Sequence, residues 1–316
     1  MNVSMNERAA ALVDGLVSDA EALGIEVRTL ESGARLVDCG ADARGGLQPG
    51  LGFAAACMGG LGRVDPVPVA VGERTWPGVA VSVDQPATAC LASQYAGWKL
   101  EDGDFFAMAS GPGRALARAE DLFDELAWRE QAERAVLCLE TAQAPPAEII
   151  EKVAERCGVD RSALTFMIAR TASVCGSVQI SARVVETALH KLHELGVDPA
   201  RVRQGWGCCP IAPVAQNDPA AIGRTNDAVL YGGTVHLWIE GADDEVADLA
   251  GRLPSSASEA FGTPFGELLE AADWNFYDID PLLFSPAAVT LTSTESGRAH
   301  HGGGLAPDVL ERSFTQ

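Results

Sequence analysis

The sequence predicts an α/β protein with mixed sheets covered by helices. Segments with strand character alternate with segments of helical period along most of the chain, which is typical of this class. With 316 residues, 47% of them hydrophobic, the chain is long enough for one large or two medium-sized domains with apolar cores. We expect two α/β domains, residues 1–130 and 131–316, separated near the charged stretch 128–134.

In the first half, helix and strand patterns follow one another from the N-terminus. Leucines and valines at helical spacing predict an amphipathic helix over residues 6–24, and Ser32-Gly33 marks the turn of a hairpin. Glycines are frequent between residues 45 and 62, where we expect the chain to wind close to a ligand or another chain. The other expected elements are hairpin strands at 25–30 and 35–39, strands at 66–71, 78–83 and 105–109, a small-residue helix at 85–98, and a helix after the Gly-Pro-Gly-Arg turn at 111–114.

The same alternation continues in the second half. Ser177 has the character of a helix cap, and a run of helical period continues from it to His193, with Gly196 as the stop signal. The acidic run 243–245 predicts the N-terminus of another helix. The remaining expected elements are strands at 135–139, 163–169, 234–239 and 288–292, and helices at 145–157, 219–230 and 265–272.

The composition argues against several classes of protein. A formal net charge of −21 disfavours nucleic acid as a partner, because phosphate binding needs clustered lysine and arginine. No segment approaches the roughly 20 apolar residues of a membrane helix, so we expect no membrane partner. The N-terminal segment lacks the basic and apolar regions of a secretory signal. The eight scattered cysteines include no C-x-x-C pair, which favours buried thiols and a reducing, cytoplasmic location.

Five polar residues form one stripe on the helix expected after Ser177. They recur at spacings of three and four on an otherwise apolar surface: Gln179, Arg183, Glu186, His190 and His193. Such a stripe faces either solvent or a wet cleft. Spacing alone favours a solvated helix edge, because an intrahelical ion pair is common and contributes only about 0.2–0.5 kcal/mol.

Two glycine-rich loops present a possible anion site. The loops MGGLG at 58–62 and SGPGR at 110–114 each have backbone N–H groups that could face an anion. Neither has the spacing of a P-loop or of a dinucleotide-binding fingerprint, so tight turns are the favoured interpretation.

Metal and nucleophile chemistry have little support in the sequence. His190-x-x-His193 and His300-His301 each lack a third ligand, so we expect no metal site. No histidine–acid pair of the triad type accompanies the serines near Glu186, and a covalent nucleophile is not expected.

Other polar and aromatic residues leave two interpretations open. Glu140 ends an apolar strand, where a carboxylate either borders a cleft, as is common in α/β folds, or serves as a cap or turn residue. The polar pairs 217–218 and 226–227 are interpreted as helix caps. Some aromatic residues beside glycines could stack on a flat heterocycle, although such residues more often lie in the core: Tyr95, Trp98 and Trp206.

Several long segments carry a family resemblance. They are VDCGADARGGLQPGLGFAAACMGGLG, ACLASQYAGW, FFAMASGPGRALA, LCLETAQAPP, TASVCGSVQISARVVETALHKL, CCPIAPVAQNDPAAIGRTNDAVLYGG and DIDPLLFSPAAVTLTSTESG. In these collinear segments the chain strongly resembles the methenyltetrahydromethanopterin cyclohydrolases of one-carbon metabolism. The resemblance implies a cyclohydrolase-type fold, not a Rossmann fold, with two α/β domains flanking a substrate cleft, and a homotrimer. It also implies reversible hydrolysis of a tetrahydromethanopterin derivative without a metal or a tightly bound cofactor.

The resemblance further implies roles for individual residues. Glu186 would be the general base that activates water, and Arg183 would keep its carboxylate ionised and oriented. The residues implied to bind the substrate are Glu140, Ser93, Gln94, Tyr95, Arg114, Ser177 and Gln179.

Two positions depart from the archaeal pattern of the family. Tyr95 stands where lysine is common, and Cys208 stands where arginine is common. The two missing cations put a distal-phosphate site in doubt and fit a cofactor variant without that phosphate, as methylotrophic bacteria use. Two alternatives remain open: a cyclohydrolase for a folate or another cyclic amidine, and a non-catalytic pterin-binding subunit. The intact Arg183 and Glu186 speak against the second alternative.

Overall fold

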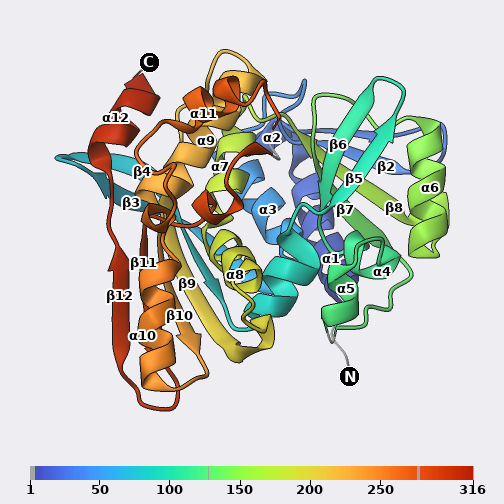
Figure 1. The fold of residues 1–316 in the computed structure, drawn as a ribbon. Coiled ribbons are helices and arrows are strands. Elements are labelled where there is room, and N and C mark those ends of the chain that lie inside the picture. Colours follow the sequence, from blue (N-terminus) through green and yellow to red (C-terminus); the bar gives the residue numbers. More distant parts are fainter. Residues whose placement is uncertain (1–3, 127, 276–277, 316) are drawn as a thin grey trace. The chain divides into compact units, whose positions relative to one another are not determined.

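The computed structural model of the protein describes residues 4–126, 128–275 and 278–315. Contacts divide the chain into two compact units that are interleaved in the sequence (Figure 1). The first unit comprises Met1–Gly62 and Thr88–Gln179, and the second comprises Arg63–Ala87 and Ile180–Gln316. The domains expected from the sequence, 1–130 and 131–316, are contiguous ranges and therefore differ from these contact-based units.

A mixed sheet of six strands forms the centre of the first unit. The strands are β1 (Glu26–Thr29), β2 (Arg35–Asp38), β5 (Trp98–Asp102), β6 (Phe105–Ser110), β7 (Ala135–Glu140) and β8 (Leu164–Ala169). Their order across the sheet is β1-β2-β8-β7-β6-β5. β8 is parallel to both of its neighbours, β2 and β7, whereas the other pairs are antiparallel.

Helices and helical turns connect these strands. They are α1 (Met5–Ser18), α2 (Ala20–Leu23), α3 (Leu47–Cys57), the π-helix η1 (Ala87–Gln94), α4 (Gly113–Ala117), α5 (Leu122–Glu125), α6 (Ala147–Cys157), η2 (Arg161–Ala163) and α7 (Val174–Ser181). The chain passes from the first unit to the second within α7.

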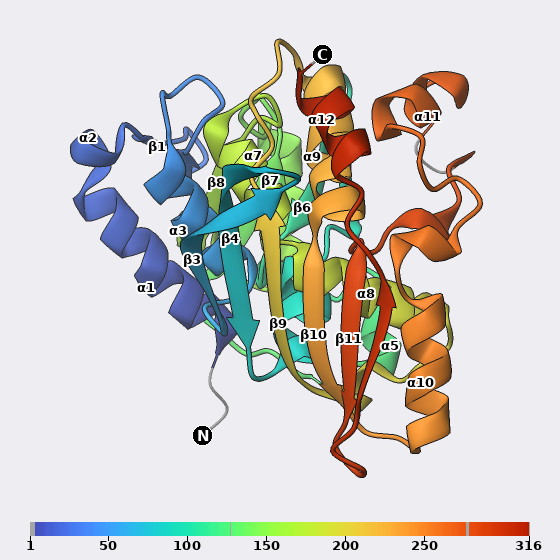
Figure 2. The same cartoon turned by 90° about the vertical axis from the view of Figure 1, so that its left-hand side faces the viewer.

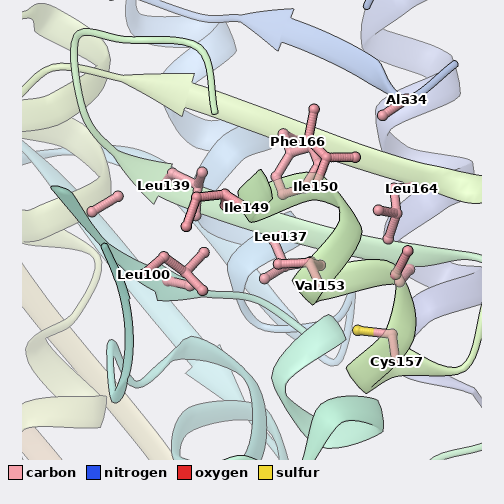
Figure 3. Close-up of a cluster of buried hydrophobic side chains, with 14 of the residues drawn as sticks. Ala34, Leu100, Leu137, Leu139, Ile149, Ile150, Val153, Cys157, Leu164 and Phe166 are labelled. Carbon is pink, nitrogen blue, oxygen red and sulfur yellow. The ribbon is translucent and has the colours of Figure 1, made fainter. Parts of the chain in front are cut away.

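Apolar side chains fill both faces of the first sheet because successive residues of a strand point to opposite sides. Leu137 and Phe166 belong to one buried cluster, whereas Val136 and Met167 belong to another. Figure 3 shows the first cluster, in which the apolar face of α6 packs on the sheet. The second cluster includes side chains from α1 and α3. β7 and β8 therefore have the continuous apolar sequences of strands that are buried on both faces.

The second unit contains another mixed sheet of six strands. The strands are β3 (Gly62–Val71), β4 (Arg74–Val83), β9 (Val202–Pro210), β10 (Thr234–Ile239), β11 (Ala288–Ser293) and β12 (Ala299–Gly303), in the order β12-β11-β10-β9-β4-β3. β10 and β11 are parallel, and β9 is antiparallel to both β4 and β10 (Figure 2). Leu237 on β10 is buried, whereas its neighbours His236 and Trp238 are half-buried on the other face.

The helices of the second unit pack mainly against this sheet and one another. They are α8 (Val184–Glu194), η3 (Pro199–Arg201), α9 (Asp218–Gly232), α10 (Asp243–Arg252), η4 (Ser255–Ala257), α11 (Phe265–Ala271), η6 (Pro281–Leu283) and α12 (Pro307–Thr315). α8 and α9 contact β9, and α10 contacts β11 and β12. In the described residues, no helix combines the length and the apolar character that crossing a bilayer requires.

The α/β prediction is confirmed, but the helix expected from Ser177 to His193 was wrong. The structure has two helices there, and Ser177 lies inside α7 rather than at a cap. Ser173 performs the capping, since its hydroxyl oxygen accepts the N–H of Gly176. The backbone N–H of Arg183 donates to the carbonyl of Ile180, three residues earlier, and this tighter turn separates α7 from α8.

Three other expectations also need correction. The glycine-rich stretch 45–62 was expected to wind, but it contains the helix α3. The expected helix 85–98 is a π-helix that stops at Gln94, and Trp98 begins β5. The pair 217–218 does cap a helix, since Asn217 accepts the N–H of Ala220, whereas the pair 226–227 lies inside α9.

Candidate active site

In the first unit, Glu140 is held by hydrogen bonds from two elements. It ends β7, next to the end of the parallel strand β8, so the loop that leaves β8 reaches its carboxylate. Thr171 in this loop donates to Oε1 at 2.6 Å, and Gln179 on α7 donates to Oε2 at 2.7 Å. The structure thus joins two predicted site residues, Glu140 and Gln179. Thr171 was not predicted from the sequence, although it opens one of the segments that carry the family resemblance.

Ser177 and Gln179 lie on α7 and are almost completely buried, at 1% and 2% exposure. The helix starts from the turn around Ser173, whose hydroxyl donates to the carbonyl of Arg170. This turn fixes the start of α7, and Gln179 is then directed by its bond to Glu140.

The segment Ser93–Tyr95 lies at the end of the π-helix η1. Ser93 and Gln94 are 0% exposed, whereas Tyr95 is half-buried. The hydroxyl of Ser93 donates to the carbonyl of Cys57 at 2.6 Å. The resemblance implies that all three residues bind the substrate. Among them, only Tyr95 reaches the surface of the described chain.

Arg114 is also completely buried. Its guanidinium pairs with both carboxylate oxygens of Glu120 and donates to the carbonyls of Leu91 and Ser93. From the family resemblance this arginine was expected to bind the substrate. The structure gives it these partners within the protein instead, and Glu120 was not identified from the sequence.

In the second unit, Arg183 and Glu186 form the expected ion pair. Arg183 is the N-cap residue of α8, and Glu186 lies in the first turn of that helix, where the helix dipole favours a carboxylate. The Arg183 Nη1 and Glu186 Oε2 atoms are 3.6 Å apart, and the two side chains are 15% and 8% exposed. The pair is therefore mostly removed from bulk water.

The other members of the expected stripe do not continue the same helix face without interruption. Gln179 belongs to α7, and Arg183 separates it from His190 and His193 on α8. His190 lies 3.7 Å from Glu194, four residues later. The expected stripe is thus divided: Gln179 lies on α7, and the other four residues lie at the start of α8 or within it.

His190 and His300 contact carboxylates, and His236 and His301 contact threonine hydroxyls. His300 lies 3.0 Å from Asp243, and the hydrogen bond from His300, helped by Ser296 and Arg298, lowers the pKa of Asp243 to about 2. Within residues 4–126, 128–275 and 278–315, no three His, Cys, Asp or Glu side chains are grouped as they would be to hold a metal ion.

Cys208 stands where arginine is common in the archaeal members of the family that the chain resembles, so a charged guanidinium is replaced by an uncharged thiol. It lies on β9 and is half-buried. Burial raises the pKa of its thiol above the ordinary value, so the thiol is neutral at pH 7.

Comparisons with known proteins identify the family of the chain. The family described as Cyclohydrolase (MCH) matches residues 4–314. The chain is 48% identical to a methenyltetrahydromethanopterin cyclohydrolase of Xanthobacter autotrophicus, over 99% of this chain and 93% of the relative. Proteins of the same name from Methylobacillus flagellatus and Methanospirillum hungatei are 46% and 39% identical; the alignments cover 98% and 99% of this chain and 95% and 99% of those relatives. The chain therefore belongs to the MCH cyclohydrolase family.

Proposed function

We propose that this protein hydrolyses the methenyl bridge of 5,10-methenyltetrahydromethanopterin to give 5-formyltetrahydromethanopterin, in a reversible step of one-carbon metabolism. The observation that carries the proposal is the similarity to methenyltetrahydromethanopterin cyclohydrolases, to which the chain is up to 48% identical over nearly its full length. The partly buried Arg183–Glu186 pair gives the proposal a chemical basis.

The reaction needs a base for water and a route for the proton of the leaving nitrogen. The substrate is a cation whose positive charge is shared between two nitrogens and the bridging carbon. Water forms a C–O bond to that carbon while Glu186 accepts one of its protons. The bond to one nitrogen then breaks, that nitrogen takes a proton, and the hydroxyl oxygen loses its remaining proton and becomes the carbonyl of the formyl group. One proton is released overall.

Arg183 is proposed to keep Glu186 ionised and directed toward water. A guanidinium 3.6 Å away favours the charged form of the carboxylate. It also opposes direct pairing of the carboxylate with the cationic substrate, which would hold the base away from water. A guanidinium at this place suits the oxygen that develops into the formyl group.

Glu140 is proposed to bind the substrate rather than to exchange protons. Each of its carboxylate oxygens has one acceptor position filled, by Thr171 and by Gln179, and each oxygen has a second lone pair. A fixed carboxylate of this kind suits N–H donors of a pterin ring. Ser93, Gln94, Tyr95 and Ser177 are proposed as residues of the same binding wall.

The substrate is proposed to be a tetrahydromethanopterin derivative for which a distal phosphate matters little. Tyr95 and the neutral Cys208 offer no cation to a phosphate. We further propose a homotrimer without a tightly bound cofactor, located in the cytoplasm. The cytoplasmic location is supported by the cysteines, none of which forms a disulfide in the described residues.

Loss of the methenyl chromophore tests the function. The purified protein should remove the absorbance of the methenyl derivatives of phosphorylated and dephosphorylated methanopterin at similar rates, and act much more slowly on methenyltetrahydrofolate. Equal efficiency on the folate would favour the alternative of a broader cyclic-amidine hydrolase. Binding of the pterins without loss of the chromophore would instead indicate a non-catalytic subunit.

A further inference from the structure

The segment Ser93–Tyr95, proposed above to form part of the substrate-binding wall, has an unusual backbone conformation. η1 is a π-helix, and the N–H of Tyr95 donates at 2.7 Å to the carbonyl of Cys90, five residues earlier. π-Turns are wide and rare, and they concentrate at functional sites. As at any helix end, the last carbonyls have no partner within the helix, so neighbouring groups must hold them.

Arg114 holds those carbonyls. Its Nη1 donates to the carbonyl oxygens of Leu91 and Ser93 at 3.2 and 3.1 Å. The carbonyl of Ser93 also accepts the N–H of Gly111 at 2.8 Å, from the turn that precedes Arg114. The end of η1 is thus tied to the SGPGR loop, which pattern analysis interpreted as a simple tight turn.

The same guanidinium contacts the ring of Tyr95. The guanidinium carbon lies 5.3 Å from the ring centroid of Tyr95 and 5.4 Å from that of Phe123, within the range of cation–π attraction. An arginine is suited to this position because its plane can stack on a ring while its edge donates hydrogen bonds.

Glu120 makes the burial of Arg114 possible. It accepts from Nε at 2.9 Å and from Nη2 at 2.5 Å in a bidentate pair, and its own side chain is only 12% exposed. Gly97 allows this approach, because a Cβ at that position would overlap the Glu120 carboxylate and press on the Tyr95 ring. The Arg114–Glu120 ion pair and the Phe123 ring therefore form a group without net charge that supports the ring of Tyr95.

We propose that Arg114 is a positioning residue: clamped by Glu120, it fixes the carbonyls of Leu91 and Ser93 and the ring of Tyr95, and so sets the shape of the substrate wall without touching the substrate. This inference rests on the proposed function, because Arg114 is inferred to act through Ser93–Tyr95, the segment that is proposed to bind the substrate. It replaces the expected direct contact between Arg114 and the substrate.

The test compares Arg114→Lys with the matched control Arg118→Lys. Lysine keeps the charge at position 114 but lacks the planar fork that reaches two carbonyls, Glu120 and a ring together. Arg118 also lies against Phe123 and donates to the carbonyls of Phe123 and Trp128, but no bond joins it to η1. The double variant Arg114→Met/Glu120→Leu removes both charges, which avoids an unpaired buried charge if Arg114→Lys fails to fold.

Two measurements are made on each folded variant. Hydrogen–deuterium exchange should rise in peptides covering 87–97 for Arg114→Lys and for the double variant, and stay at the wild-type level in peptides covering β7 and β8. The KM for the methenyl substrate should rise about tenfold while kcat stays within about threefold, as expected when binding common to ground and transition states is lost. Arg118→Lys should change neither quantity.

A coupling experiment tests the ring contact. Tyr95→Leu should raise KM, and adding Arg114→Lys to it should raise KM less than it does in the wild-type background, because the two residues act together. Folded Arg114 variants with the exchange and KM of Arg118→Lys would overturn the proposal. If the wild-type protein hydrolysed no methenyl derivative, the proposed function would fail, and the exchange comparison alone would still decide whether Arg114 holds this segment.

Discussion

Glu186 keeps only 8% of its side-chain exposure, and its partner Arg183 keeps 15%. The nearby His190–Glu194 contact on the same helix leaves its glutamate 42% exposed. Exposed ion pairs contribute about 0–1 kcal/mol to stability, so removing the charge of Glu194 should change the free energy of unfolding little. A mostly buried carboxylate is costly to desolvate, so its placement at a helix N-terminus beside an arginine fits a chemical task better than a stabilising one.

The first prediction follows from this contrast. Glu186→Gln preserves the size of the side chain but cannot accept a proton from water, so the rate of chromophore loss should fall about 10²–10⁴-fold. Binding of the substrate should survive. Glu194→Gln, on the same helix, is the control and should retain wild-type turnover.

Arg183→Ala should also slow turnover, and the double variant with Glu186→Gln should be slowed by less than the product of the two effects, because the pair acts as one unit. Near-normal turnover of Glu186→Gln would remove Glu186 as the base, whatever the family membership of the chain.

Asp227 supplies a prediction about pH. Burial raises the pKa of Asp227 to about 6, although its carboxylate accepts the N–H of Phe265 at 2.7 Å. The unfolded chain releases this proton near pH 4. Between about pH 4 and pH 6 the folded protein binds more protons than the unfolded chain, so this group makes stability fall as the pH rises through that window.

Asp227→Asn cannot ionise and keeps an oxygen for the N–H of Phe265. Its free energy of unfolding should exceed that of the wild type by up to about 3 kcal/mol at pH 7, and by little at pH 4.5. Urea unfolding at both pH values measures this. Asp248→Asn, at the surface beside Arg252, is the control and should change stability by the same small amount at both pH values. An Asp227→Asn gain that does not change with pH would contradict the argument.

Single residues were predictable from sequence where their role is local. The cap at Asn217 depends on four consecutive residues, and it is confirmed. Asp227 was interpreted as a cap, but it bonds to a residue 38 positions away, which no local pattern indicates. The burial of Arg114 likewise depends on Glu120 and on the rings around it, and arginine is almost never fully buried without such partners.

Elements were predictable where their hydrophobic period was regular. α6, β7, β8 and β10 were expected within about two residues of their observed ends, because each has one apolar face or a continuous apolar run. The break between α7 and α8 was missed because neither glycine nor proline marks it. β9 was missed because Gly205 and Gly207 weaken its strand pattern.

Those glycines have a tertiary cause. A Cβ at Gly205 would lie 2.8 Å from Val185 Cγ1, and one at Gly207 would lie 2.7 Å from Val184 Cγ1. β9 therefore needs glycine so that α8, the helix that carries Glu186, can approach the sheet. The need for glycine at these two positions can be predicted only when it is known that α8 packs on β9.

The end of α8 gives a prediction at the scale of the element. Gly196 has φ +79, and the N–H of Val197 donates to the carbonyl of Leu192, the arrangement of a glycine-terminated helix. Gly196→Ala should lower the free energy of unfolding by about 1 kcal/mol because alanine is strained at positive φ.

Gly251 in α10 is the matched control, since it has ordinary helical φ and open space around it. Gly251→Ala should raise stability by about 0.4–1 kcal/mol. Thermal or urea unfolding of the two variants measures both effects. Equal signs for the two substitutions would show that the backbone at Gly196 is not the constraint.

At the scale of the whole chain, the interleaving of the two units was beyond the sequence patterns. The pairing of β4 with β9 joins Val81 to Gly207, and it places residues 63–87 in the same unit as the C-terminal half. A local pattern predicts that a segment is a strand but not which distant strand it joins. The α/β class was predictable because it depends only on the alternation of elements, whereas the division into units depends on long-range pairing.

The last prediction concerns assembly. We expect light scattering at micromolar concentration to give a mass three times that of the 33.0 kDa chain. Each copy carries a formal charge of −21, so association brings together like charges and has to be driven by burial of apolar surface. Salt screens charges over about 10 Å at 0.1 M and over shorter distances at higher concentration, so added salt should favour the trimer.

Raising sodium chloride from about 0.05 M to about 0.5 M should therefore leave the mass unchanged or increase the trimeric fraction, and dilution should lower the unfolding temperature of an assembled protein by mass action. A monomeric mass at both salt concentrations would exclude the trimer. A trimer that dissociates as salt is added would show instead that specific ion pairs between copies outweigh the repulsion of their net charges.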